Sequence, residues 1–323
     1  MKYTEFFNLG DYPFNLTPDL RFYYRSQSQR RALAYLSFGL SKGEGFVVIT
    51  GEIGAGKTVF IDYFLSQLPQ NDVVTATITS TQFEADSFLR MVASAFGLQQ
   101  ANADKATVFR HLEEFLRDTH RRGVRAILII DEAQGLPVSA LEELRMLSNV
   151  YHRGRPMLQV FLVGQPEFRR NLAGRGLEQL RQRIVAIHHL TPLKDSETRE
   201  YILFRLTTAG WADDPAIAAE CFPLIHQEAR GVPRLVNNLC DRLLWHAFIE
   251  EKHAITVEDV EMVIGDMRLD ASGLTLDGEP SPEIDLGVEP EEADQLEEAH
   301  RRDSASAGTD RVVGFHASHG KDN

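Results

Sequence analysis

The octet GEIGAGKT at residues 51–58 directly follows the apolar run FVVIT. A glycine-rich loop between a strand and a helix turns backbone N–H groups onto phosphate oxygens, and the helix dipole adds to the attraction. Lys57 is expected to contact the β and γ phosphates of ATP, and Thr58 to bind Mg²⁺. Because such loops also serve kinases, transport ATPases and switches, this one predicts ATP and Mg²⁺ as ligands without fixing an activity. The residues predicted to bind the nucleotide are Gly51, Glu52, Ile53, Gly54, Ala55, Gly56, Lys57, Thr58 and Val59.

Short apolar runs alternate with segments of helical period through residues 1–192. Strands separated by helices predict an α/β fold in three layers, with a parallel sheet between helices, as in P-loop NTPases. The strands are expected at 46–50, 73–78, 126–130, 157–164 and 184–190. The helices between them are expected at 57–68, 84–96, 106–121 and 137–150.

After about residue 192 only helical periodicity remains, which predicts a small helical lid domain at residues 193–270. Residues 271–323 contain 13 of the 47 acids but only 4 of the 34 Lys and Arg residues, with few large apolar side chains. Such a segment buries too little surface to fold, so an acidic, disordered tail is expected. The rest of the chain is close to neutral, and its basic stretches RRGVR and RGVPR are short, which argues against a protein built mainly to grip nucleic acid.

Polar residues stand where two of the predicted strands end. Asp131 and Glu132 follow AILII, and the carboxyl ends of parallel strands line the ligand crevice of such a sheet. There Asp131 is expected to hold Mg²⁺ and Glu132 to act as general base on the attacking water, which favours a hydrolase over a kinase. Gln165 ends the next strand, and it either orients that water as a sensor of the γ phosphate or caps the following helix.

Three arginines are candidates for stabilising charge in the transition state. Arg181 and Arg183 precede the last strand, and one of them, by our prediction Arg183, acts as a finger on a neighbouring subunit's nucleotide. Arg234 follows Gly231 and Pro233 at a predicted helix start, where the helix dipole disfavours a cation. Reaching the γ phosphate would explain its position, whereas an exposed surface arginine is the alternative.

Composition limits the cellular setting. No segment approaches the roughly 18 consecutive apolar residues of a membrane span, and the opening MKYTEFFNLGDYPF lacks the layout of a signal peptide. The two cysteines, Cys221 and Cys240, have neither disulfide nor metal-site spacing, so buried thiols are expected. These observations predict a cytoplasmic protein.

Taken in order, GEIGAGKT, ILIIDEAQ, LVGQPEF, LRQR and GVPR resemble the motifs of AAA+ ATPases of the secretion type. The opening segment FFNLGDYPFNLTPDLRFYYRSQSQRRALAYLSFGL resembles that family's N-terminal signature, which implies that it packs beside the adenine, most directly through residues 24–32. The resemblance implies an oligomer, because a finger in trans needs a second subunit.

A closer resemblance, over about residues 1–270, is to the ATPases that accompany exosortase and PEP-CTERM systems, carried by LRMVASAFGL, ALEELRMLSNV, GLEQLRQRIVAIHHL and GWADDP. It implies a cytoplasmic ATPase, peripheral at the inner membrane, that serves exopolysaccharide export or protein sorting. Two positions depart from the usual pattern: Val59 replaces a second hydroxyl, and Leu235 replaces an arginine. General secretion pathway A proteins are similar but carry a membrane span and a peptidoglycan-binding part after the ATPase.

These patterns together predict an ATP-hydrolysing AAA+ protein with a membrane-associated export or sorting partner. Two alternatives stay open at this point. One is a nucleic-acid-associated regulator of the transposition or replication type, which shares this architecture. The other is a nucleotide-gated scaffold that binds ATP but turns it over little.

Overall fold

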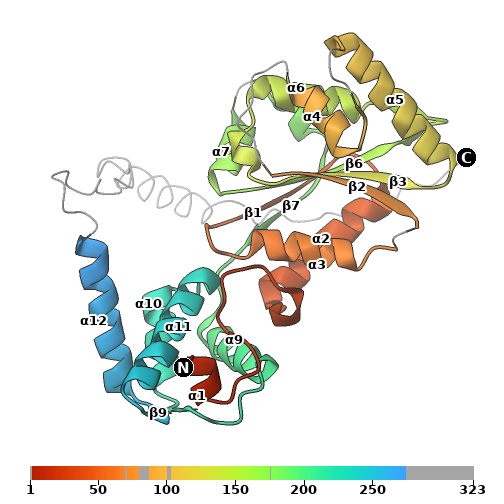
Figure 1. Ribbon diagram of the computed structural model, residues 1–323. Coiled ribbons are helices and arrows are strands. Elements are labelled where there is room, and N and C mark those ends of the chain that lie inside the picture. The colour runs from red at the N-terminus through yellow and green to blue at the C-terminus, as the bar shows by residue number, and fades with distance from the viewer. Residues whose placement is uncertain (1, 70, 80–86, 100–102, 175, 274–323) are drawn as a thin grey trace, which may run out of the picture. The chain divides into compact units, whose positions relative to one another are not determined.

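Five parallel strands form the central sheet of the computed structural model (Figure 1). Their order across the sheet is β2-β3-β6-β1-β7. The strands are β1 (Phe46–Gly51), β2 (Val73–Ile78), β3 (Arg125–Ile130), β6 (Leu158–Gly164) and β7 (Ile184–Leu190). All five predicted strands and their parallel arrangement are confirmed. The structure describes residues 2–69, 71–79, 87–99, 103–174 and 176–273.

Helices cover both faces of the sheet, because successive strand residues point to opposite sides. Val48 and Leu128 belong to a core shared with α4 (Phe88–Ala95), α5 (Lys105–Arg121) and α6 (Val138–Leu147). Ile49 and Ile129 belong to a core shared with α2 (Gln27–Lys42) and α3 (Lys57–Ser66). All four side chains are fully buried. The predicted three-layer fold is confirmed, and Figure 1 shows α2 and α3 on the opposite side of the sheet from α4–α7.

The four helices predicted in this part begin and end close to the predicted positions, as α3 (Lys57–Ser66), α4 (Phe88–Ala95), α5 (Lys105–Arg121) and α6 (Val138–Leu147). Three further helices had no predicted range: α2 (Gln27–Lys42), α7 (Glu167–Ala173) and α8 (Glu178–Arg181). Shorter elements are the 3₁₀ turns η1 (Leu20–Phe22) and η3 (Ala133–Gly135) and the hairpin of β4 (Tyr151–His152) and β5 (Arg155–Pro156). The predicted start of the helix at 84–96 lies outside the described residues.

The chain after residue 192 is mainly helical, as predicted. Its helices are α9 (Asp195–Thr208), α10 (Cys221–Ala229), α11 (Pro233–Ile249) and α12 (Val257–Gly273). Two short strands, β8 (Ala216–Ile217) and β9 (Ala254–Ile255), pair in parallel. These strands were not predicted, because two residues are too few for a detectable alternation of apolar and polar side chains. Cys221 and Cys240 are buried free thiols, as expected. Of the predicted acidic tail, α12 includes residues 271–273, and residues 274–323 lie outside the described residues.

The opening segment of the chain packs with this helical part. Tyr3 of α1 (Tyr3–Phe6), Phe7 and Phe14 are buried in one apolar cluster with residues of α9, α10 and α11. The buried guanidinium of Arg205 on α9 donates to the backbone oxygens of Pro13 and Asn15, at 2.5 and 3.2 Å. The predicted domain boundary at residue 192 remains a prediction. In space, residues 3–14 complete the core of the helices that follow residue 192.

Candidate nucleotide site

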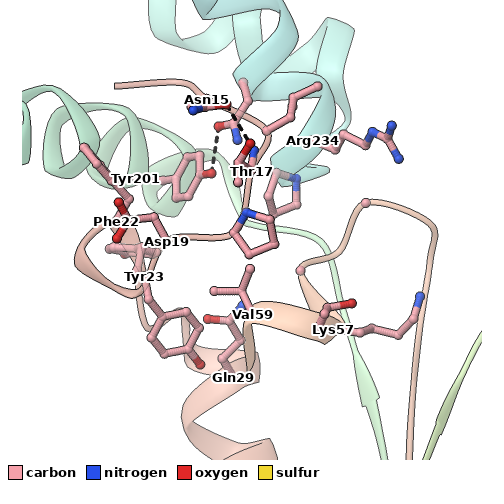
Figure 2. A pocket seen from close by; sticks show the side chains of 18 of the residues that line it. Asn15, Thr17, Asp19, Phe22, Tyr23, Gln29, Lys57, Val59, Tyr201 and Arg234 are labelled. Carbon is pink, nitrogen blue, oxygen red and sulfur yellow. Dashed lines mark hydrogen bonds between the residues drawn. The ribbon is translucent and has the colours of Figure 1, made fainter. Parts of the chain in front are cut away.

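A cavity of about 510 Å³ lies where the sheet's carboxyl edge, the N-terminal segment and the helical part meet. This volume falls in the range of small-molecule sites. Figure 2 shows aromatic side chains, among them Phe22, Tyr23 and Tyr201, at one end of the cavity, and the cations of Lys57 and Arg234 at the other. We name these the base end and the phosphate end, because a nucleotide has one apolar and one highly charged end.

The phosphate loop, residues 51–58, forms most of the phosphate end. Gly56 caps α3 with a left-handed backbone (φ +81°), a conformation that glycine adopts without strain. Lys57 is 7% exposed, and its Nζ donates to the carbonyl oxygens of Gly51 at 2.8 Å and Glu52 at 3.1 Å. Burial lowers the pKa of the Lys57 ammonium, although the Glu132 carboxylate nearby favours the charged form. The loop thus holds its own cation in place by two backbone bonds.

The nine predicted nucleotide-binding residues fall into two groups. The carbonyl oxygens of Gly51 and Glu52 hold Lys57, and Ala55 is buried, so these three support the loop from behind. The others line the cavity directly: Ile53, Gly54, Gly56, Lys57, Thr58 and Val59.

The predicted Mg²⁺ ligands lie next to each other. The Thr58 hydroxyl donates to Oδ2 of Asp131 at 3.1 Å, and Asp131 is 7% exposed. Hydroxyl and carboxylate oxygens suit Mg²⁺, which commonly takes one or two protein oxygens and completes its shell with phosphates and water. Within the described residues no cluster of three or more His, Cys, Asp or Glu side chains could hold a metal alone. The donor set therefore fits Mg²⁺ bound together with a nucleotide.

Glu132 and Gln165 are brought together by the strand order. β6 lies between β1 and β3, so Gln165 after β6 lies between the phosphate loop and the acids after β3. The Nε2 of Gln165 donates to Oε2 of Glu132 at 3.1 Å, and both residues line the cavity. Burial works to raise the pKa of Glu132, but bonds from Gln134 and Gln165 outweigh it and hold this pKa below its usual range. Glu132 is therefore a carboxylate at neutral pH.

Gln134 is a site residue that the sequence reading missed. Its Nε2 donates to Oε2 of Glu132 at 2.5 Å, and its Oε1 accepts from the backbone N of Gln165 at 2.9 Å. A Cβ on Gly164 would lie 2.8 Å from that Oε1, so only glycine leaves room for this side chain. The sequence contained one signal for this role. A glutamine stands two residues after the expected base, in DEAQ, and a glycine, Gly164, ends the neighbouring strand β6.

Arg234 lies at the phosphate end, attached to the loop by its backbone. Its N–H donates to the Gly54 carbonyl at 3.2 Å, and α11 begins at Pro233, as the sequence predicted. A Cβ on Gly54 would come within 2.7 Å of the Arg234 Cβ, so the glycine permits the helix start to approach. Leu235, which replaces an expected arginine, is 44% exposed and does not line the cavity.

Arg181 and Arg183 have different surroundings. The Arg181 guanidinium donates to the carbonyl oxygens of Leu172 and Gly174, at 2.6 and 2.8 Å, and so caps the end of α7. Arg183 precedes the edge strand β7 and does not line this cavity. Its carbonyl accepts from Phe46 N at 2.9 Å, at the end of β1 remote from the phosphate loop. Within the described residues its guanidinium has no hydrogen bond or ion pair.

The base end is larger than the stretch expected from the sequence. Of residues 24–32, Tyr24 and Gln29 line the cavity. The chain just before them contributes more, and α9 and α11 add side chains that the sequence reading did not consider. These additional lining residues are Asn15, Leu16, Thr17, Pro18, Asp19, Phe22, Tyr23, Leu193, Tyr201, Arg205, Pro233 and Asn237.

Solved structures and a family match define the class of protein. Residues 40–172 match the protein family described as AAA domain. Cdc6p from Pyrobaculum aerophilum has a TM-score of 0.62 at 16% identity, over 86% of this chain and 74% of that one. The Aeropyrum pernix ORC2 protein, in its ADPNP–ADP complexes, has a TM-score of 0.60 at 17% identity, over 79% and 71%. The chain has the fold of AAA+ P-loop NTPases.

A curated relative narrows the class. General secretion pathway protein A of Aeromonas hydrophila is 36% identical over 261 residues, which are 80% of this chain and 47% of the relative. The chain therefore contains an AAA domain and is related in sequence to general secretion pathway protein A. It spans about half the length of that relative. Among the described residues, no helix is both long and apolar enough to span a bilayer.

Proposed function

We propose that the protein hydrolyses ATP in this cavity and couples the nucleotide cycle to an export or sorting system at the inner membrane. The observation that carries hydrolysis is the Glu132 carboxylate, held by two side-chain amides on the sheet edge beside the phosphate loop. Glu132 accepts the proton of the attacking water, and Gln165 orients that water. Lys57 and Arg234 stabilise the charge on the phosphates. Mg²⁺ held by Thr58 and Asp131 would neutralise charge on the phosphate oxygens.

Phosphate release tests this enzyme assignment. The unaltered protein is compared with Lys57→Ala, which loses the buried cation, and Glu132→Gln, which loses the base. Both variants are expected to release phosphate far more slowly than the unaltered protein. Equally slow release by all three proteins would contradict hydrolysis and favour the nucleotide-gated scaffold.

We infer further that the active form is an oligomer in which Arg183 acts on a neighbouring subunit. Arg181 already caps α7, whereas the Arg183 guanidinium has no partner among the described residues and lies away from its own chain's cavity. An arginine delivered in trans contributes factors of about 10³ to 10⁵ in related NTPases.

A mixing experiment separates action in trans from action in cis. Arg183→Ala keeps a complete phosphate loop, and Lys57→Ala keeps the arginine. Each variant alone is expected to be inactive, and a mixture is expected to regain part of the activity because one chain supplies the site and the other the arginine. An inactive mixture that still forms mixed oligomers would contradict the assignment.

The partner is proposed from likeness alone. The curated relative is general secretion pathway protein A, and the sequence resembles exosortase-associated ATPases. We expect the protein to crosslink in cells, in an ATP-dependent way, to an inner-membrane export or sorting component. Nucleotide-dependent, salt-sensitive binding of labelled DNA would instead favour the nucleic-acid regulator.

A further inference from the structure

The side chain of Gln29 is buried although it carries a polar amide. It is 9% exposed, and its Oε1 has no hydrogen-bond partner within the described part of the chain. Buried polar atoms are almost always paired, so an unpaired acceptor on a side chain that lines a cavity calls for a ligand.

The local sequence offers Gln29 a partner that it does not take. Residues 26–29 read SQSQ, the pattern of a capping box, in which the glutamine would reach back to the backbone N–H of the cap residue. The Ser26 half is formed, since the Ser26 hydroxyl accepts from Gln29 N at 3.2 Å and caps α2. The Gln29 half is not formed, because its Oε1 stays unpaired. Gln29 lines the cavity instead.

Gln29 also lies between the phosphate loop and the aromatic side chains of the base end. Its Nε2 is 3.6 Å from the position of a Cβ on Gly56, so it touches the end of the loop. Figure 2 shows Gln29 close to Val59 and on the same side of the cavity as Tyr23. The aromatic ring of Tyr23 is itself stacked on Tyr63, with centroids 4.4 Å apart. An aromatic and apolar wall with one carboxamide suits a planar base with a polar edge.

We propose that the Gln29 carboxamide reads the base and makes this site selective for adenine over hypoxanthine and guanine. The selection rests on the proposed function, since it requires the nucleotide to occupy this cavity. Oε1 accepts from the exocyclic amine of adenine, and Nε2, which makes no hydrogen bond among the described residues, donates to the ring nitrogen N7, the bidentate pairing that glutamine makes with this base. Hypoxanthine and guanine present a carbonyl oxygen in place of the amine, which would face an acceptor and leave both oxygens without a donor.

The unaltered protein gives the first test, without any hydrolysis. Affinities are measured for ADP, IDP, GDP and N6,N6-dimethyl-ADP, which share the ribose and the diphosphate. ADP is expected to bind at least about tenfold more tightly than the other three, because one good base pairing of this kind discriminates by 1–3 kcal/mol. IDP binding within threefold of ADP overturns the selection. If none of the four binds, the proposed function falls together with the selection.

The variant Gln29→Leu gives the second test. Replacing an unpaired buried amide by an apolar side chain of similar size is expected to leave the fold intact. The ADP to IDP affinity ratio should fall to about threefold or less, through weaker ADP binding rather than tighter IDP binding. Gln67→Leu, at an exposed position after α3, is the matched control and should keep the full ratio. An unchanged ratio in Gln29→Leu, or equal weakening of ADP and IDP, overturns the assignment, since a ribose contact or general packing would then explain the side chain.

Discussion

The two ends of the cavity are built in different ways. At the phosphate end, Lys57 is held by carbonyl oxygens five and six residues away, and Glu132 by a glutamine two residues away. At the base end, Arg205 binds backbone oxygens about 190 residues earlier in the chain.

The residues proposed to act in hydrolysis are therefore held by contacts different from those that join the distant segments of the base end. The phosphate end is fixed mainly by one loop and the tips of adjacent strands, so it is preorganised by the sheet. The base end forms only when the N-terminal segment has docked on α9 and α11. We therefore expect changes at the phosphate end to alter turnover with little effect on folding, and changes behind the base end to alter stability and base binding.

The largest effect is expected for Glu132→Gln. Removing a general base slows turnover by about 10² to 10⁴. ADP affinity and the free energy of unfolding should change little, because the amide keeps the shape of the side chain. Phosphate release, ADP titration and urea denaturation measure the three quantities. Glu52→Gln is the control, since Glu52 contributes a backbone oxygen to the loop while its side chain is exposed. A large loss of stability in Glu132→Gln would contradict the expectation that changes at the phosphate end have little effect on folding.

Arg205→Met tests the base end. The variant removes hydrogen bonds to Pro13, Asn15 and the Tyr201 hydroxyl, and should lower the free energy of unfolding by about 3 kcal/mol. ADP affinity should also fall, because the segment that lines the base end loses its attachment. Urea denaturation and ADP titration measure both effects.

Arg199→Met is the matched control for this change. Arg199 is exposed on the same helix and lies over the Phe222 ring at 5.5 Å, a contact worth about 1 kcal/mol or less. Equal destabilisation of the two variants would show that Arg205 does not tether the N-terminal segment.

Asp259→Asn tests whether stability in the helical part can change without any effect on the site. Burial alone would raise the pKa of Asp259, but Lys252 and Thr256 donate to it and lower this pKa to about 2. A folded pKa below the unfolded value of 3.8 gives stability of roughly 2 kcal/mol that is fully present above about pH 4. It is lost as the pH falls toward 2.

Denaturation at pH 7, 5 and 3 should show a difference between Asp259→Asn and the unaltered protein that shrinks only at the lowest pH. ADP affinity at pH 7 should stay the same. Asp266→Asn, at an exposed position of α12, should be neutral throughout. A pH-independent difference would mean that the Asp259 charge is not the cause.

The smallest effect is expected for Gln134→Leu, which leaves the base in place but removes an amide that donates to it. Turnover should fall about tenfold, equivalent to about 1.4 kcal/mol, with ADP affinity unchanged. The acid limb of the pH–rate profile should move to higher pH, because one of the bonds that lower the Glu132 pKa is gone.

Two comparisons show whether Gln134 acts by position. Gly164→Ala should reproduce the slow turnover, since the new Cβ would displace the same side chain. Gln182→Leu, an exposed glutamine after α8, should turn over normally. An unshifted pH profile in Gln134→Leu would mean that the residue is only a structural support.

The sequence predicted most of the fold and half of the cavity. The strands were predictable because each is a short apolar run bounded by polar residues, and the position of Gln165 beside the acids followed from the parallel order of strand ends. Gln134 could not be assigned, since its partners belong to two different strand ends. The strands β8 and β9 were too short to leave a pattern.

What the sequence determined by itself is the phosphate loop, the acids after β3 and the helix start at Pro233. Each of these features depends on residues close together in the chain, so the local backbone preferences and the spacing of apolar residues are enough to predict it. Only the tertiary structure decided that Arg181 is already bound to α7, that residues 15–24 and α9 complete the cavity, and that Gln29 faces it without a partner. These are contacts between segments far apart in the chain, and no local pattern specifies which distant segment will satisfy a given polar group.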